Sequence, residues 1–319
     1  MRNVLLGAGG TGTAFAIASR LRATWGNTIK LVVTDIYDEN LVTASLLADK
    51  FYKVPYANAP SFGKALRDIM LNESIQTYIP ILNDEIVLAN GMAKDPALRH
   101  VDFWSSDMHA LCTDKVYADE WLRSIGVRTP ENVDLSAIEG KSGPWFAKPR
   151  RGFGSRGAHI LHREDLANMK ESDIDDLIIQ ELCEKPEVTV DSFYDSTTGT
   201  GYAYCRERLE TKSGVCTKAR LFADAELSAF ATKIGQALEQ RGTICFQVMR
   251  SKRGWVATDL NLRSGAGTAM TCSAGYDVLS AAFACRIGED YSSFVKPLND
   301  KEEYLITRQY SEFVMRHDL

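Results

Sequence analysis

Residues 255–263 bring together side chains that could hold a cation and an anion. The stretch reads Trp-Val-Ala-Thr-Asp-Leu-Asn-Leu-Arg, and the alternation of an extended strand predicts one face carrying Ala257, Asp259, Asn261 and Arg263. A carboxylate and an amide carbonyl are ligands that a hard cation prefers, and a guanidinium can hold a phosphate or carboxylate with two hydrogen bonds. The pattern indicates a magnesium–phosphate site, and a plain polar surface strand is the alternative.

A second group of candidate residues follows a short apolar run that ends at Lys148. Residues 150–157 contain three glycines, three arginines and Ser155. Backbone amides in such a loop can wrap anionic oxygens, and the lysine adds a point charge. The Gly-Lys-Ser/Thr ending of a Walker loop is missing. We therefore expect a flexible, positive flap over phosphates, with a basic surface hairpin as the alternative.

A glycine turn near the N-terminus offers a competing interpretation. Gly7, Gly9 and Gly12 fit G-x-G-x-x-G between a strand and a helix, and Asp35 ends the next strand. The pattern fits NAD binding, or equally a Rossmann-like unit whose glycines only allow a tight turn.

A polar pair follows a later strand, over residues 78–82. Asp84 and Glu85 could face the same crevice as the glycine turn, because ligands of open α/β sheets lie beyond the carboxyl ends of strands. The interpretation that they cap a helix beginning at Ile86 is favoured, because acids suit the first turn of a helix.

Three units must position these residues. Residues 1–105 alternate strand and helix, which predicts a parallel α/β unit. Residues 106–182 contain a helix that opens at 113–115 and runs to about Ser124, and the hairpin that carries the flap. Residues 183–319 contain antiparallel strands, an amphipathic helix over 227–240 and a hairpin that places Gln247 beside Asp259; residues 300–319 show little pattern.

Composition narrows the function classes. The net charge of −5 disfavours a general role with nucleic acid, and the sequence offers no apolar run long enough to cross a bilayer. Seven cysteines are scattered without metal-binding spacing. The sequence also starts directly with a strand, so we expect a cytoplasmic protein in a reducing compartment.

Several short motifs follow one another along the chain in an order that a known protein family shares. They are Lys148-Pro149 with the glycine loop, Ile179-Gln180-Glu181, Glu187, Gln247, and Asp259-x-Asn261-x-Arg263. In this order the sequence resembles the ATP-grasp superfamily, and most closely its carbamoyl phosphate synthetase-like branch of carboxylate–amine ligases. The resemblance covers nearly the whole chain. It implies a Rossmann-like pre-ATP-grasp domain without a dinucleotide, followed by an ATP-grasp fold of two subdomains, with boundaries at 1–105, 106–182 and 183–319.

The resemblance also implies roles for individual residues. Phosphate contacts fall to Lys115, Lys148 and the amide of Ser155, and the adenine and ribose contacts to Gln180, Glu181, Leu182 and Glu187. The metal ligands are Gln247, Asp259 and Asn261, and Arg263 acts with Lys148 on the transferred phosphoryl group. The family usually has Glu at position 259 and often an acid at 247. Ser264, Gly265, Asp84 and Glu85 are weaker candidates for substrate contact.

The implied activity is ATP-dependent joining of a carboxylate to an amine through an acyl phosphate, with ATP and Mg²⁺ (or Mn²⁺). Amino acids or a small biosynthetic carboxylate are the implied substrates, and dimers are common among such enzymes. The amine proton would pass to a carboxylate such as Asp191 or to phosphate. A nucleotide-binding protein without ligase activity and an NAD-dependent oxidoreductase are the alternatives.

Overall fold

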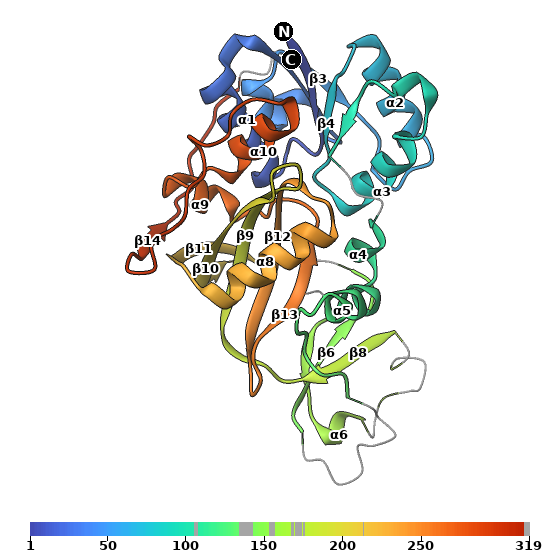
Figure 1. The fold of residues 1–319 in the computed structure, drawn as a ribbon. Helices are drawn as coiled ribbons and strands as arrows, with labels where there is room; N and C mark the ends of the chain where they lie inside the picture. The colour runs from blue at the N-terminus through green and yellow to red at the C-terminus, as the bar shows by residue number, and fades with distance from the viewer. Residues whose placement is uncertain are drawn as a thin grey trace.

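Three β-sheets organise the computed structural model, which describes residues 1–104, 108–133, 143–152, 157–166, 169, 174, 176–212 and 214–315 (Figure 1). The first sheet is parallel, with strand order β3-β2-β1-β4-β5. Its strands are β1 (Arg2–Leu6), β2 (Ile29–Asp35), β3 (Lys50–Lys53), β4 (Thr77–Ile79) and β5 (Asp102–Phe103). Residues 4–6 of β1 and 31–33 of β2 are apolar and fully buried because helices cover both faces of such a sheet.

The helices of this first unit follow its strands in alternation. They are α1 (Gly12–Trp25), α2 (Phe62–Asn72) and α3 (Asn83–Met92), with short 3-10 turns η1 (Gly26–Thr28), η2 (Glu39–Leu41), η3 (Thr43–Leu47) and η4 (Pro96–Leu98). Helix α3 begins at Asn83, three residues before the predicted start at Ile86. The predicted parallel α/β unit is otherwise confirmed.

The second sheet is small and antiparallel, with order β7-β6-β8. Its strands are β6 (Trp145–Pro149), β7 (His159–Leu161) and β8 (Leu177–Glu181), and the nearby helices are α4 (Ala110–Thr113), α5 (Lys115–Ser124) and α6 (Arg163–Leu166). Strands β6 and β7 form the predicted hairpin, in which Trp145 faces Leu161. The loop between them carries the predicted flap.

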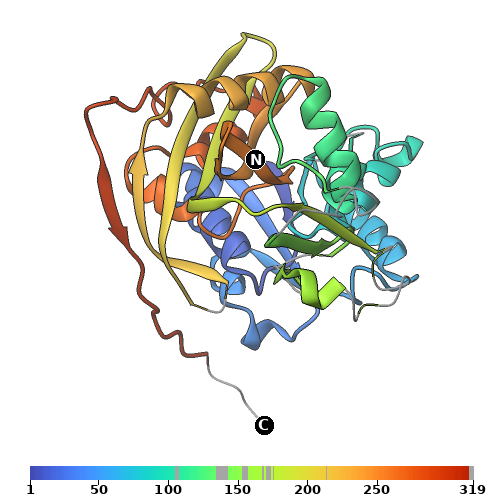
Figure 2. The same cartoon turned by 90° about the horizontal axis from the view of Figure 1, so that it is seen from below.

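The third sheet has the order β13-β12-β9-β10-β11-β14. Its strands are β9 (Glu184–Asp195), β10 (Thr200–Lys212), β11 (Val215–Phe222), β12 (Arg241–Ser251), β13 (Gly254–Asn261) and β14 (Tyr304–Thr307), and its helices are α8 (Ala225–Ala237), α9 (Thr268–Ser273) and α10 (Val278–Ile287). Strand β14 lies where the sequence showed little pattern. Figure 2 shows this sheet from below, with β14 at its outer edge.

A β-bulge at Thr258 alters the predicted alternation of β13. Asp259 pairs with Gln247, whereas Ala257 pairs with the next residue, Val248, so Thr258 has no partner of its own. The prediction that Ala257 shares a face with Asp259 is therefore wrong. Ala257 packs with Leu260 in the apolar core under α8, and the polar side chains after the bulge lie on the opposite face.

One hydrophobic core joins the first unit to the last. Helix α1 packs against α10 (Figure 1). The Trp25 ring lies 4.7 Å from the Phe283 ring. The same cluster includes Ile17 from the first unit and Tyr204 from the third sheet. Among the described residues, no helix combines the length and apolarity that crossing a bilayer requires.

Candidate active site

The predicted metal ligands converge on β12 and β13. Gln247 lies directly opposite Asp259, and the Asn261 amide donates a hydrogen bond of 2.9 Å to the Asp259 carboxylate. Within the described part of the chain, no three His, Cys, Asp or Glu side chains gather as a metal cluster. One carboxylate with two amides suits Mg²⁺, which takes few protein ligands and completes its shell with water and phosphate oxygens.

Two lysines approach this carboxylate from the small sheet and from α5. Lys148 is buried at the end of β6, and its Nζ donates to the carbonyl of Thr258 at 3.0 Å. Lys115 begins α5, and its Nζ donates to the carbonyl of Gly152 at 2.8 Å. Burial lowers the pKa of Lys115, and the nearby Asp259 carboxylate opposes that shift. The bulge thus presents the carbonyl that holds Lys148 beside the metal ligands.

Asp119 belongs to the same charge cluster and was missed in the sequence analysis. It is buried on α5, and its carboxylate accepts a 2.7 Å hydrogen bond from Gln180. Burial raises the pKa of Asp119, Lys148 lowers it, and Asp259 raises it further. The signal was present, because Asp119 follows Lys115 by four residues on one helix and therefore shares its face. Gln180 is held by Asp119 rather than pointing at solvent.

The Arg263 side chain has a hydrogen-bond donor that is available to an anion. Its Nη1 donates to the carbonyl of Ser264 at 3.0 Å, while its buried Nε has no hydrogen-bond partner. An unsatisfied buried donor costs about 1–3 kcal/mol. The side chain could therefore donate to an anionic oxygen, as the predicted phosphoryl contact requires.

The loop after Arg263 is packed against the sheet. Ser264 is buried, and the amide of Gly265 donates to the Thr268 hydroxyl at 3.0 Å. Arg308, at the end of β14, donates to the carbonyl of Ala266 at 2.9 Å, and burial lowers its pKa. Sequence analysis missed Arg308 because no element was predicted around it. The guanidinium groups of Arg263 and Arg308 thus both donate to carbonyls of this loop.

The flap is anchored at its base. The Arg150 side chain donates to Asp114 at 2.9 Å, and the Arg150 carbonyl accepts from the amide of Lys115 at 3.1 Å. The predicted contact of Ser155 falls outside the described residues. The flap therefore begins beside the two lysines.

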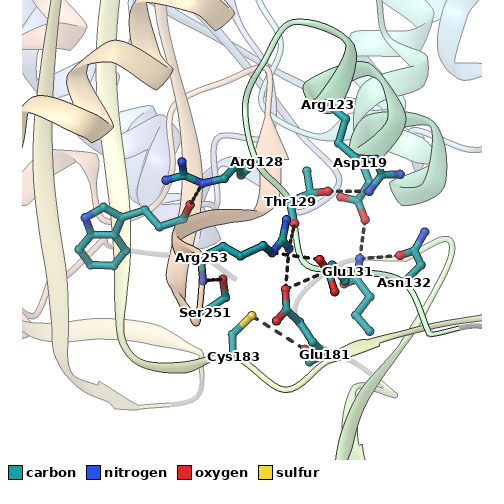
Figure 3. Close-up of polar contacts among 12 residues, drawn as sticks. Asp119, Arg123, Arg128, Thr129, Glu131, Asn132, Glu181, Cys183, Ser251 and Arg253 are labelled. Atoms are coloured by element: carbon teal, nitrogen blue, oxygen red, sulfur yellow. Dashed lines mark hydrogen bonds and ion pairs between the residues drawn. The ribbon is translucent and has the colours of Figure 1, made fainter.

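The predicted adenine end lies where β8 leaves the small sheet. The Glu181 carboxylate accepts from Arg253 at 2.7 Å and from the amide of Glu131 at 3.0 Å, as Figure 3 shows. Arg253 also pairs with Glu131, at 3.2 Å. The Glu181 side chain is thus engaged within the protein. Leu182 is exposed beside it, and its backbone is the better candidate for the adenine edge.

Two acids on β9 have different surroundings. Glu187 forms an ion pair with Arg208 and stays partly exposed, so its predicted ribose contact would compete with that pair. Asp191 is fully buried and accepts hydrogen bonds from Thr268, Thr271 and Arg206. We no longer assign Asp191 as a base for the amine, because its carboxylate is enclosed and already has three donors.

The glycine turn is filled by the protein's own carboxylates. A Cβ placed on Gly7 would lie 2.3 Å from the Glu85 carboxylate, which accepts from the amides of Ile81 and Leu82 at 2.8 and 3.0 Å. The Asp35 carboxylate accepts from the amide of Gly10 at 2.7 Å. Two acids at the turn oppose a pyrophosphate, and the geometry therefore favours the tight-turn interpretation over NAD binding.

The same geometry decides between the two interpretations of Asp84 and Glu85. Glu85 is buried and bonds the residue before α3, which is the favoured capping role. Asp84 lies exposed on the first turn of the helix. Glu85 is therefore not available for substrate contact, and Asp84 keeps only its position near the crevice.

Residues 112–267 match the family model described as ATP-grasp domain. The chain contains an ATP-grasp domain. The ATP-grasp match begins near α4 and ends in the loop after Arg263, so it includes every predicted phosphate and metal residue. No curated protein sequence matches the chain. The coarse prediction of an ATP-grasp enzyme is confirmed by this match, whereas the bond that it forms stays a prediction.

Solved structures share the ATP-grasp fold. N5-carboxyaminoimidazole synthetase from Staphylococcus aureus is 15% identical over 96% of this chain and 82% of its own, with a TM-score of 0.74. The biotin carboxylase domain dimer of the Hydrogenobacter thermophilus 2-oxoglutarate carboxylase, in complex with MgADP, ADP and bicarbonate, is 16% identical over 90% of this chain and 70% of its own, also with a TM-score of 0.74. At this identity the likeness confirms the predicted fold class and no more.

Proposed function

We propose that this chain is an ATP-dependent ligase that joins a carboxylate to an amine through an acyl phosphate. The observation that carries the proposal is the buried, unpartnered Nε of Arg263, which follows the strand that carries Asp259. Lys115 and Lys148 supply the positive charge that a polyphosphate requires at the same place. Amino acids or a small biosynthetic carboxylate are the proposed substrates, and a homodimer is the proposed assembly.

In this proposal, the nucleotide lies between the small sheet and β12–β13. Lys115 and Lys148 contact its phosphates, the backbone of Leu182 contacts the adenine, and Glu187 contacts the ribose. Gln247, Asp259 and Asn261 would hold Mg²⁺ (or Mn²⁺), which when bound neutralises phosphate charge and stabilises charge that builds during transfer. The cluster of two lysines with the buried Asp119 and the half-buried Asp259 supports this arrangement.

The proposed chemistry has two steps. An oxygen of the substrate carboxylate attacks the γ-phosphorus of ATP, the bond to the bridging oxygen breaks, and ADP leaves. The amine then attacks the acyl carbon, phosphate leaves, and the departing phosphate accepts the amine proton. Arg263 and Lys148 stabilise the charge on the transferred group through fixed contacts, which cost no reorganisation during the reaction.

The test measures phosphate release with pairs of amino acids, and with bicarbonate as one of the carboxylates. Lys148→Ala and Asp259→Ala should each lower turnover by about 10²–10³-fold, because each removes a charged contact to the transferred group. Lys64→Ala, on the exposed face of α2, is the control and should leave turnover unchanged. Full turnover in both active-site variants would refute the assignment.

Ligand binding separates the alternatives. ATP with Mg²⁺ should raise the melting temperature and NAD should not, because a ligand that binds only the native state stabilises it. A rise with ATP but no amine-dependent phosphate release would instead support a nucleotide-binding protein without ligase activity. A rise with NAD alone would support the oxidoreductase.

A further inference from the structure

A buried ion pair lies behind the loop that follows Arg263. Asp191 on β9 is 0% exposed and Arg206 on β10 is 2% exposed. The Asp191 carboxylate accepts from the hydroxyl of Thr268 at 2.7 Å, from the hydroxyl of Thr271 at 2.6 Å and from Nε of Arg206 at 3.1 Å. Both threonines belong to α9, so this one carboxylate bonds the sheet to the helix at the end of the loop.

The loop itself leaves no room above this pair. A Cβ placed on Gly267 would lie 2.4 Å from Nη1 of Arg206, and one placed on Gly265 would lie 3.2 Å from Sγ of Cys245. These backbone positions therefore rest directly on the arginine and the cysteine. Residues 264–268 thus contact Arg206 and Cys245, and the threonine hydroxyls bond the end of the loop to Asp191.

The first residue of the same loop orients Arg263. Its carbonyl, on Ser264, accepts the 3.0 Å hydrogen bond from Nη1 of Arg263, whose Nε has no hydrogen-bond partner. Any shift of the loop would therefore move the guanidinium. A displacement of about 1 Å at a reacting group can cost on the order of 10²-fold in rate.

We propose that Asp191 and Arg206 are positioning residues, which hold Arg263 at the reacting phosphate through Thr268, Thr271 and the 264–268 loop. The inference rests on the proposed ligase function for its effect on rate. The role of these residues in keeping the 264–268 loop rigid does not depend on the ligase function. A buried ion pair is weak evidence for stability by itself, so its alignment with the loop is what assigns the role.

The test removes one threonine donor to Asp191 without changing its shape. Thr271→Val deletes a hydroxyl that bonds Asp191 and leaves Thr268, which also accepts from the Gly265 amide, intact; Thr271→Ser retains the hydroxyl. Hydrogen exchange is followed in peptides covering residues 262–275, with α8 as the internal reference, and kcat and the KM for ATP are measured by phosphate release. The valine variant should show about tenfold faster exchange in residues 262–275 and a 10- to 100-fold lower kcat, with the KM for ATP within twofold.

The serine variant should restore both readouts, because it retains the bond to Asp191. A second variant, Gly267→Ala, presses on Arg206 without removing a bond and should also lower kcat; Gly91→Ala in α3, where a Cβ meets nothing within 4 Å, is its control. Gly267→Ala takes the place of the valine variant in the test if the valine variant fails to fold.

Two outcomes would overturn the inference. One is unchanged exchange in residues 262–275 of the valine variant, and the other is unchanged kcat despite faster exchange. If the wild-type protein releases no phosphate with any pair, the proposed function fails, and exchange alone then decides whether the loop is held by Asp191.

Discussion

At the scale of single residues, Glu85 carries the clearest pH dependence. Burial raises its pKa from 4.5 to about 7, although the amides of Leu82 and Ile81 favour the anion. Between these two values the folded protein binds more protons than the unfolded chain at this site. Stability therefore falls as pH rises from about 4.5 to 7, and the loss is complete above 7.

Replacement of Glu85 by Gln should remove this pH dependence. The melting temperature of Glu85→Gln relative to wild type should rise as pH increases from 5 to about 7 and then level off, because the amide has no charge to bury and its oxygen can still accept from both backbone amides. Asp84→Asn, one residue away and exposed, is the matched control and should shift nothing. Parallel curves for wild type and Glu85→Gln would contradict the assignment.

The residues with unusual chemistry were largely predictable. Asp259, Asn261 and Gln247 meet as their spacing indicates, because a hairpin places opposite positions together. Asp119 was missed although its spacing from Lys115 places it on the same helix face, and only packing shows that it is buried. Arg308 was missed because no element was predicted around it, and packing leaves it half-buried. The sequence shows how residues are spaced along an element, whereas their burial depends on how distant elements pack.

At the scale of elements, Arg253 links the β12–β13 hairpin to the small sheet. It donates to the Glu181 carboxylate at 2.7 Å and to the carbonyl of Thr129 at 3.0 Å (Figure 3). These contacts hold the end of β8, where the adenine is proposed to bind. A partly exposed pair of this kind contributes about 1 kcal/mol at most.

Arg253→Ala should therefore weaken ATP binding by up to about fivefold, with little change in melting temperature. Titration calorimetry with ATP and Mg²⁺ measures the effect. Lys252→Ala, on the same exposed turn, should bind ATP like wild type. Equal affinities in the two variants would show that the hairpin does not support the adenine end.

The bulge shows where an element departs from its pattern. Alternation along residues 255–263 predicts the polar face correctly from Asp259 onward and wrongly at Ala257, because one extra residue reverses the alternation. The bulge also frees the Thr258 carbonyl that accepts from Lys148. Strand propensities do not encode such an insertion, which depends on the pairing with β12.

At the scale of the whole molecule, the sequence divides into three units, but in the structure the first and the last unit share one hydrophobic core. Trp25 at the end of α1 packs against Phe283 of α10 and donates to Glu289 at 2.9 Å. We expect Trp25→Ala to lower the free energy of unfolding by about 3–5 kcal/mol, because a large buried ring leaves a cavity.

This loss should appear in one transition rather than two. Denaturant unfolding followed by fluorescence and by circular dichroism should give coincident curves for both proteins. Trp25→Phe keeps a ring and should lose less. Separate transitions in the wild-type protein would mean that the first unit and the third sheet unfold independently.

The shared core also limits how this protein can be dissected. A fragment cut to residues 112–267 would keep every proposed phosphate ligand yet lose both α1 and α10. Phe193, Tyr204 and Leu221 would then meet solvent on the face that those helices cover. Such a fragment should precipitate or aggregate. A chimera that joins the proposed catalytic part to another N-terminal domain would need to keep α10 and to supply a helix surface like that of α1 to pack against it.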